Sequence, residues 1–160
     1  MDDETLQKLI ARAISYVSFR LRSGKEIHDY LVKRIKGDEE YIFLAEARLK
    51  ELGYIDDVTY TKRFIESRNR SRPKGKKLIQ LELRRKGVSA DVIDSINTDG
   101  PSDIELARAV VQKKYSLWKK LPILEQKRKL FGLLQRRGFS SNVIFHIIDE
   151  LTGLTYNEDT

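Results

Sequence analysis

Two stretches of this 160-residue chain concentrate positively charged side chains that could bind an anion. Residues 60–87 hold 11 basic and two acidic side chains, around a Pro-Gly segment that we expect to form an exposed loop without an anchor. Cations that reach one surface together favour a nucleic-acid backbone or another acidic partner. The candidate binding residues of this stretch are Arg68, Arg70, Arg72, Lys74, Lys76, Lys77, Arg84, Arg85 and Lys86.

The second stretch, residues 113–137, holds nine basic side chains and one acidic side chain. Its candidate binding residues are Lys127, Arg128, Lys129, Arg136 and Arg137. The simpler alternative is a solvated face whose cations only complement the C-terminal end of a helix. Because the pattern recurs in both stretches, we favour two basic patches that form a track for an extended partner.

Two aromatic residues, Tyr115 and Trp118, lie among the lysines of the second stretch. Aromatic rings between cations can form a stacking platform for nucleobases. In a small helical unit they more often anchor the core, and we interpret them in that way.

Catalytic and metal-binding groups are scarce. The chain has no cysteine and only two histidines, and it contains neither an H-E-x-x-H motif nor a P-loop. His28 and His146 have no evident partners, so we expect packing or surface roles for both. Asp56 and Asp57 precede an apolar helix and are interpreted as capping residues. The sequence therefore predicts a protein that is not an enzyme and that uses no metal and no cofactor.

The N-terminal residues, Met1-Asp2-Asp3-Glu4, are acidic where a signal peptide would be basic. No apolar run approaches the roughly 20 residues that a membrane span requires. We therefore expect a cytoplasmic monomer with no membrane partner.

The elements that must position the cations are helices. Glycine and proline interrupt the chain at intervals typical of helices of three or four turns. Ser23 with Glu26 and Ser102 with Glu105 match the capping box S-x-x-E. A β-branched run near residue 143 would also suit a strand, but its apolar stripe continues at helical spacing to Leu151. The predicted fold class is all-α. Further candidate N-caps are Asp38, Asp56, Ser89 and Ser140.

An internal repeat organises these helices. With a shift of 51 residues, residues 77–96 align without a gap on residues 128–147, and both copies read as a helix, a glycine stop and a second helix. A fainter copy begins near Ile27, but Ile35 stands where the glycine would be. We predict an elongated array of three tandem three-helix repeats of helix-turn-helix type. The predicted limits are residues 1–53, 54–99 and 100–153, followed by a polar tail at residues 154–160.

In a helix-turn-helix DNA reader, the helix after each turn would present Arg, Asn or Gln to base edges. Here that helix, at residues 89–96 and 140–147, carries mostly aliphatic and acidic side chains. We interpret both segments as packing helices and expect any DNA contact to involve the backbone.

Several short motifs follow one another in a definite order and spacing over essentially the whole chain. The motifs are Ala13-Ile14-Ser15-Tyr16, Gly53-Tyr54-Ile55-Asp56-Asp57 with Tyr60 and Phe64, Lys74-Gly75, Glu82-Leu83, Lys86-Gly87-Val88, Leu134 and Arg136-Arg137-Gly138-Phe139. In this order and spacing they resemble the RecX family. The chain departs from the family at Thr61, where Ala is usual, and at Ile35.

The resemblance implies a bacterial regulator, built from three-helix repeats, that lies along the groove of the RecA nucleoprotein filament. Such a protein would inhibit the ATP hydrolysis, strand exchange and co-protease activity of RecA, and so act in homologous recombination, DNA repair and the SOS response. We expect the cations above to contact the filament and to bind single- and double-stranded DNA weakly, without sequence preference. The alternative is a stand-alone helix-turn-helix DNA-binding protein with a transcriptional role.

Overall fold

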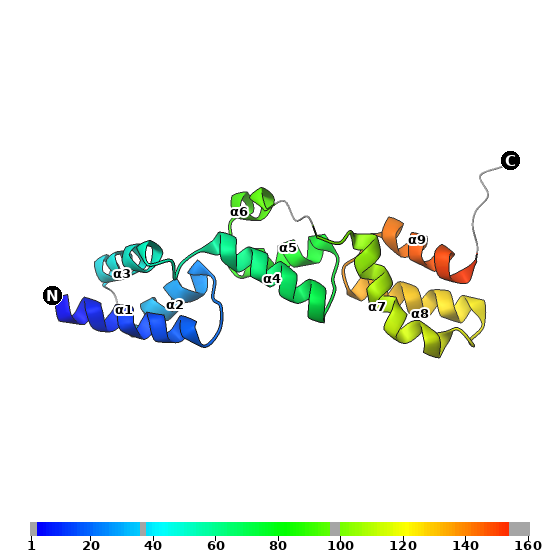
Figure 1. Ribbon diagram of the computed structural model, residues 1–160, viewed down its shortest axis with the longest axis horizontal. Coiled ribbons are helices and arrows are strands. Elements are labelled where there is room, and N and C mark those ends of the chain that lie inside the picture. Colours follow the sequence, from blue (N-terminus) through cyan, green and yellow to red (C-terminus); the bar gives the residue numbers. More distant parts are fainter. Residues whose placement is uncertain (1–2, 36–37, 97–99, 154–160) are drawn as a thin grey trace. The chain divides into compact units, whose positions relative to one another are not determined.

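The computed structural model describes residues 3–35, 38–96 and 100–153 (Figure 1). The regular secondary structure of these residues is entirely α-helical, which confirms the predicted fold class. The predicted tail, residues 154–160, lies outside the described residues. The helices are α1 (Asp3–Ser18), α2 (Gly24–Arg34), α3 (Glu39–Glu51), α4 (Asp57–Ser71), α5 (Lys76–Arg85), α6 (Ala90–Ser95), α7 (Asp103–Trp118), α8 (Ile123–Arg136) and α9 (Ser141–Thr152).

Both predicted capping boxes are present. At the start of α2, the Ser23 hydroxyl accepts a hydrogen bond from the Glu26 amide, and the Glu26 carboxylate accepts one from the Ser23 amide. Ser102 and Glu105 repeat this arrangement at the start of α7. These bonds satisfy N–H groups that have no partner within the helix. The other predicted N-caps that accept a bond from a nearby amide are Asp38, Asp56, Ser89 and Ser140.

Two glycines end the second helix of their repeats with the same backbone conformation. Gly87 follows α5 with a φ of 81°, and Gly138 follows α8 with a φ of 77°. This left-handed conformation favours glycine because it has no β-carbon. At the corresponding point of the first repeat, Ile35 caps α2 with a φ of −117°. The predicted helix, glycine turn and helix are thus present in residues 77–96 and 128–147, and the run near residue 143 is helical.

The helices form two compact units, one of Met1–Phe64 with Glu82–Asn97 and one of Ile65–Leu81 with Thr98–Thr160. In the first unit, α1, α2 and α3 pack around buried side chains such as Ile27 and Leu49. In the second unit, α7, α8 and α9 pack around Leu130, Leu134 and Ile147. The boundary passes through α4 and α5, so the exact limits of the three repeats stay a prediction.

A junction within the first unit joins the start of α2 to the start of α4 and the end of α5. The Ser23 hydroxyl donates to the Lys86 carbonyl at 2.6 Å, and the Gly24 amide donates to the Asp57 carboxylate at 2.8 Å. The Lys86 ammonium lies 3.2 Å from the Glu26 carboxylate. Asp57 therefore caps a helix of the preceding repeat. We call this contact the first junction.

An equivalent contact, the second junction, lies within the second unit. The Gly75 amide donates to the Arg137 carbonyl at 2.9 Å, and the Lys76 amide donates to the Asp103 carboxylate at 3.1 Å. A β-carbon added to Gly75 would lie 2.2 Å from the Gly138 carbonyl oxygen, so only glycine fits there. The prediction of an unanchored Pro-Gly loop is wrong, because backbone contacts rather than apolar side chains hold this segment.

Gly75→Ala is expected to lower the free energy of unfolding by about 1–3 kcal/mol, because the added methyl group must push two backbones apart. The matched control is Gly132→Ala inside α8, where the new methyl group would approach only the flexible Arg136 side chain, at 3.2 Å. This control should raise the free energy of unfolding by up to about 1 kcal/mol through helix propensity. Urea unfolding followed by circular dichroism measures both variants, and equal stabilities would contradict a tight junction.

Candidate functional site

The cations between residues 68 and 77 are distributed over two helices and the turn between them. Helix α4 continues to Ser71 and stops just before Arg72, the residue whose helical conformation Pro73 disfavours. The predicted loop is therefore shorter than expected. Arg68 and Arg70 lie in the last turn of α4. Arg72 and Lys74 lie in the turn between the helices, and Lys76 and Lys77 lie in the first turn of α5.

Arg70 lines a cleft of about 250 Å³ within the second unit. Lys113 and Lys114 of α7 and Arg137 at the end of α8 line the same cleft. We call this site, defined by these four residues, the cationic cleft. Walls that converge on a hollow concentrate the field of like charges, so the site is suited to a polyanion.

One uncharged group in the cationic cleft lacks a hydrogen-bond partner. The Asn69 Oδ1 atom is buried and accepts no hydrogen bond within the described part of the chain. An unpaired buried acceptor costs free energy. Because this atom has almost no accessible surface, the cleft offers its cations to a partner and not this acceptor.

Lys113 and Lys114 precede Tyr115 and begin the second basic stretch, but they are not among the binding residues predicted from the sequence. The net charge of that stretch was the available signal. Helix α7 places these two lysines in the same hollow as Arg70 of α4. This arrangement depends on tertiary contacts between segments that are distant in the sequence.

Apart from Arg70, the candidate cations of the first stretch do not line the cationic cleft. Arg84 and Arg85 are exposed in the last turn of α5, where they complement the helix dipole. Lys86 is half-buried and pairs with Glu26 in the first junction. Of this group, Lys86 therefore has a structural role.

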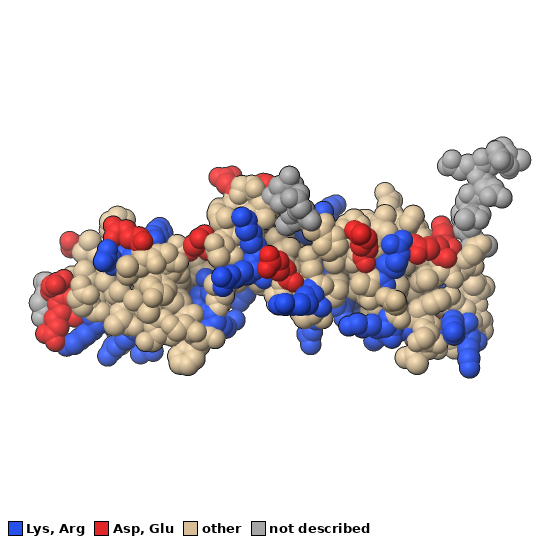
Figure 2. Space-filling view, in the orientation of Figure 1, with Lys and Arg blue, Asp and Glu red and all other residues tan. Residues whose placement is uncertain are grey.

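The cations of the third repeat are also divided between sites. Lys127 and Arg128 line a separate depression of about 810 Å³, together with Phe131 and Phe145. Lys129 lies 6.0 Å from the centre of the Trp118 ring. Arg136 is exposed in the last turn of α8. Lysine and arginine side chains gather along the lower edge of the surface over α7 and α8 in Figure 2.

The aromatic residues of α7 anchor the core, as expected. Trp118 is partly buried against the core of the second unit. The Tyr115 hydroxyl donates to the Leu151 carbonyl at 2.8 Å, which ties α7 to the end of α9. Neither ring serves as an open stacking platform.

The two histidines are exposed, which agrees with the surface role expected for them, but each has an acidic neighbour that the sequence did not indicate. His28 Nδ1 lies 2.7 Å from the Glu46 carboxylate on α3, and His146 lies 3.9 Å from Glu150 one turn later. Among residues 3–35, 38–96 and 100–153, no group of three or more His, Asp or Glu side chains is placed to hold a metal ion. None of the helices described is long and apolar enough to cross a membrane.

The helices after the glycine turns pack as interpreted from the sequence. Ile93 of α6 is buried, and α9 buries Ile144, Ile147 and Ile148 in the core of the second unit. Helix α6 is only six residues long. These helices are therefore structural elements of their repeats.

Two family models match this chain. One, described as "RecX, second three-helix domain", matches residues 56–95, and the other, "RecX, third three-helix domain", matches residues 102–148. Together the matches span more than half of the sequence. The chain belongs to the RecX family. A protein of Prosthecochloris aestuarii named "Regulatory protein RecX" is 33% identical over 156 residues, which are 94% of this chain and 98% of the relative.

Other RecX relatives are longer. A "Regulatory protein RecX" of Oceanobacillus iheyensis is 37% identical over 152 residues, which are 92% of this chain and 55% of the relative. This chain therefore spans about half the length of that relative. The crystal structure of RecX from Lactobacillus salivarius has a TM-score of 0.80 at 25% identity, and the match covers 94% of this chain and 99% of that one. The RecX fold thus extends over nearly all of this chain.

Glu26 in the first junction is the buried end of an ionic contact. Its side chain is 16% exposed and accepts a hydrogen bond from the Ser23 amide. Burial raises the pKa of the Glu26 carboxyl, but the Ser23 amide and the Lys86 ammonium outweigh burial and hold this pKa below its ordinary value of 4.5. The ionised form is therefore favoured in the folded chain.

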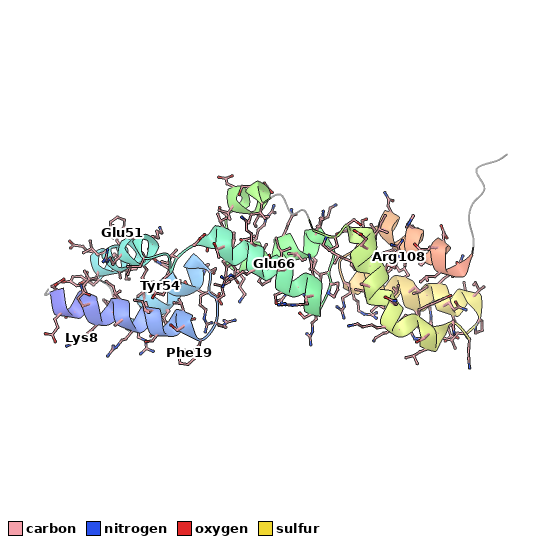
Figure 3. All side chains as sticks on the ribbon, in the orientation of Figure 1. Lys8, Phe19, Glu51, Tyr54, Glu66 and Arg108 are labelled. Carbon is pink, nitrogen blue, oxygen red and sulfur yellow. The ribbon has the colours of Figure 1, made fainter. Side chains whose placement is uncertain are left out.

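Glu26→Gln is expected to destabilise the chain at neutral pH, with a difference from wild type that shrinks as the pH falls below 4.5. A carboxyl whose pKa is lower in the folded than in the unfolded state stabilises fully above the unfolded pKa, and this contribution is lost as the pH falls through the folded pKa. Urea midpoints between about pH 3 and pH 7 measure this difference. The control, Glu66→Gln on α4, changes an exposed residue outside the junction (Figure 3) and should alter stability little. A Glu26→Gln penalty that is constant with pH would contradict the ionic junction.

Proposed function

We propose that this RecX-family chain is a non-enzymatic regulator that binds the RecA–DNA filament and inhibits its ATP hydrolysis, strand exchange and co-protease activity. The observation that carries the proposal is the cationic cleft, in which Arg70, Lys113, Lys114 and Arg137 line one hollow. The relatives' name, "Regulatory protein RecX", supports a regulatory role. On this proposal the chain acts as a cytoplasmic monomer in homologous recombination, DNA repair and the SOS response.

The placement of two further lysines supports an anionic partner. Lys76 and Lys77 lie in the first turn of α5, which contains no acidic residue. A helix N-terminus carries a partial positive charge, so cations there oppose the helix dipole. No acidic side chain within this turn compensates these charges, and although the Asp103 carboxylate caps the Lys76 amide, a bound polyanion would still be attracted by the two lysines.

The chemistry of the cleft indicates how a partner would be held. The Arg70 guanidinium can donate two parallel hydrogen bonds to a phosphate or carboxylate. The Arg137 guanidinium, whose Nη1 atom donates to the Pro73 carbonyl at 3.4 Å, keeps its other N–H groups for such a partner. Lys113 and Lys114 add compact charges that attract a backbone without reading its sequence. Bases need not be distinguished, which suits a filament that assembles on any DNA.

Inhibition would follow from steric and electrostatic effects. A chain held across successive recombinase subunits occupies the groove that a second DNA duplex must enter. The same contacts oppose the change in filament extension that accompanies nucleotide turnover. Strand exchange and ATP hydrolysis would therefore decrease together.

The alternative, a transcriptional helix-turn-helix protein, has less support. Helix α6 presents Asp91 and Asp94 to solvent, and these carboxylates would be repelled by DNA phosphates. Helix α9 exposes one side chain of a base-reading type, Asn142, beside Phe145 and His146, and it contains no arginine or glutamine. A helix that reads a DNA sequence would be expected to present several such side chains.

Arg70→Glu/Lys113→Glu is expected to weaken filament binding by at least about tenfold and to abolish inhibition of ATP hydrolysis, because carboxylates would replace cations from two walls of the cleft. Binding is measured by co-sedimentation with RecA, single-stranded DNA and a slowly hydrolysed nucleotide. Inhibition is measured as the steady-state rate of ATP hydrolysis by RecA.

The matched control is Lys33→Glu/Lys50→Glu, which makes the same change of net charge at exposed positions in the last turns of α2 and α3. This control should bind and inhibit like wild type, and circular dichroism should show both double variants to be folded. An equal loss of binding in both double variants would mean that net charge alone causes the effect, and would contradict the proposal that the cationic cleft is the binding site.

Binding to naked duplex DNA is expected to be weak and steeply salt-dependent. Contact with about five phosphates gives a log–log slope near −4.5, and loss of the two cleft cations should reduce its magnitude by about 2. Fluorescence anisotropy over a range of salt concentrations measures both slopes. A strong preference for one duplex sequence that persists at physiological salt would instead favour the transcriptional alternative.

A further inference from the structure

The first unit carries a stack of aromatic rings and guanidinium groups that is separate from the cationic cleft. The rings of Tyr16 on α1 and Tyr30 on α2 are stacked, with centroids 4.1 Å apart and planes 10° apart. The Arg22 guanidinium lies 4.1 Å from the Tyr16 centroid, and the Arg34 guanidinium lies 4.9 Å from the Tyr30 centroid. Because each member restrains its neighbours, the stack forms an ordered wall.

This wall borders a depression of about 390 Å³ that is also lined by Arg12 and Phe19. Phe19 is 89% exposed and projects from the chain just after α1 (Figure 3). Arg12 lies on α1 and lines the same depression as Phe19. We call this site, defined by Arg12, Tyr16, Phe19, Tyr30 and Arg34, the aromatic depression.

The aromatic depression retains positive charge. Within the described residues, Arg12 and Arg34 form no ion pair, whereas Arg20 and Arg22 share the Glu26 carboxylate at 3.0 Å and 3.8 Å. The first two guanidinium groups are therefore available to an anion. They lie beside the exposed ring of Phe19 and the stacked ring of Tyr30.

Folding does not explain the position of Phe19. A phenylalanine ring that stays in water gains almost none of the free energy that burial would give it. Open aromatic rings beside arginines are the arrangement by which proteins hold single-stranded nucleic acid, since the rings stack on bases and the cations contact the backbone. Paired bases in a duplex are already stacked on each other and cannot enter such a site.

We infer that the aromatic depression binds an unpaired base of single-stranded nucleic acid, stacked on Phe19, with the flanking phosphates at Arg12 and Arg34. The site shares no residue with the cationic cleft and requires no recombinase. It therefore goes beyond the proposed function, and it adds contact with bases to a chain whose other cations contact only phosphates.

Phe19→Ala is expected to weaken binding to a short oligothymidylate by about 5- to 150-fold, the range that corresponds to one stacked base. Binding to an oligomer of the same length built from abasic sites should not change, because that oligomer has phosphates but no bases. Phe19→Trp should retain wild-type affinity for the oligothymidylate. Fluorescence anisotropy of end-labelled oligomers measures all three.

The matched control is Phe43→Ala, which removes another exposed ring of the first unit, on α3, that does not line the depression. Its affinity for the oligothymidylate should equal that of wild type. Phe19→Ala should cause the same loss of oligothymidylate affinity in the Arg70→Glu/Lys113→Glu background. The proposal for the aromatic depression can therefore be tested even if the proposal for the cationic cleft is wrong.

Three results would overturn the inference. One is an equal affinity of Phe19→Ala and Phe43→Ala for the oligothymidylate. Another is a Phe19→Ala loss of the same size on the abasic oligomer, which would mean that bases are not contacted. The last is weaker filament binding with unchanged oligothymidylate binding, which would make Phe19 a protein contact.

Discussion

A glycine turn pressed against the start of an earlier helix holds consecutive repeats of this chain together. In the second junction, Gly75 and Gly138 approach so closely that any side chain on Gly75 is excluded. The Asp103 carboxylate accepts a hydrogen bond from the start of α5 in this contact, as the Asp57 carboxylate accepts one from the start of α2 in the first junction. The cationic cleft depends on the same contact. The Arg137 carbonyl accepts a hydrogen bond from the Gly75 amide, and the Arg137 side chain lines the cleft. Backbone packing therefore sets the positions of the charges.

The two candidate surfaces differ in the part of a nucleic acid that they suit. The cationic cleft offers guanidinium and ammonium groups to a backbone, an attraction that salt weakens. The aromatic depression offers the ring of Phe19, and stacking on a ring is much less sensitive to ionic strength. Each surface lies within one compact unit, so each site can be considered separately.

Local features of this fold could be predicted from the sequence, because their residues lie within one or two turns of each other. The capping box of Ser23 and Glu26 and the turn at Gly138 are of this kind. Contacts between distant segments could not be predicted. The hydrogen bond from the Gly24 amide to the Asp57 carboxylate joins residues that are 33 positions apart. Through it Asp57, at the start of α4, also caps the start of α2.

The same distinction applies to the candidate sites. The basic stretches showed where charge is concentrated, but the cationic cleft combines Arg70 with Lys113 and Lys114 through tertiary packing. Likewise, the stack of Tyr16 on Tyr30 joins two helices whose apolar patterns indicate only that each is helical. The backbone anchoring of Gly75 was missed because hydropathy carries no information about carbonyl and amide contacts.

Helices α4 and α5 each belong to both compact units, which links the folding of one unit to that of the other. Residues 57–64 of α4 pack with the first unit and residues 65–71 with the second. Each half is shorter than the roughly 12–15 residues that an isolated helix needs in water, so it depends on packing within its own unit. Opening of either unit would therefore expose the helical hydrogen bonds at the boundary, and the amides of Ile65 and Glu82 would report it by faster hydrogen exchange.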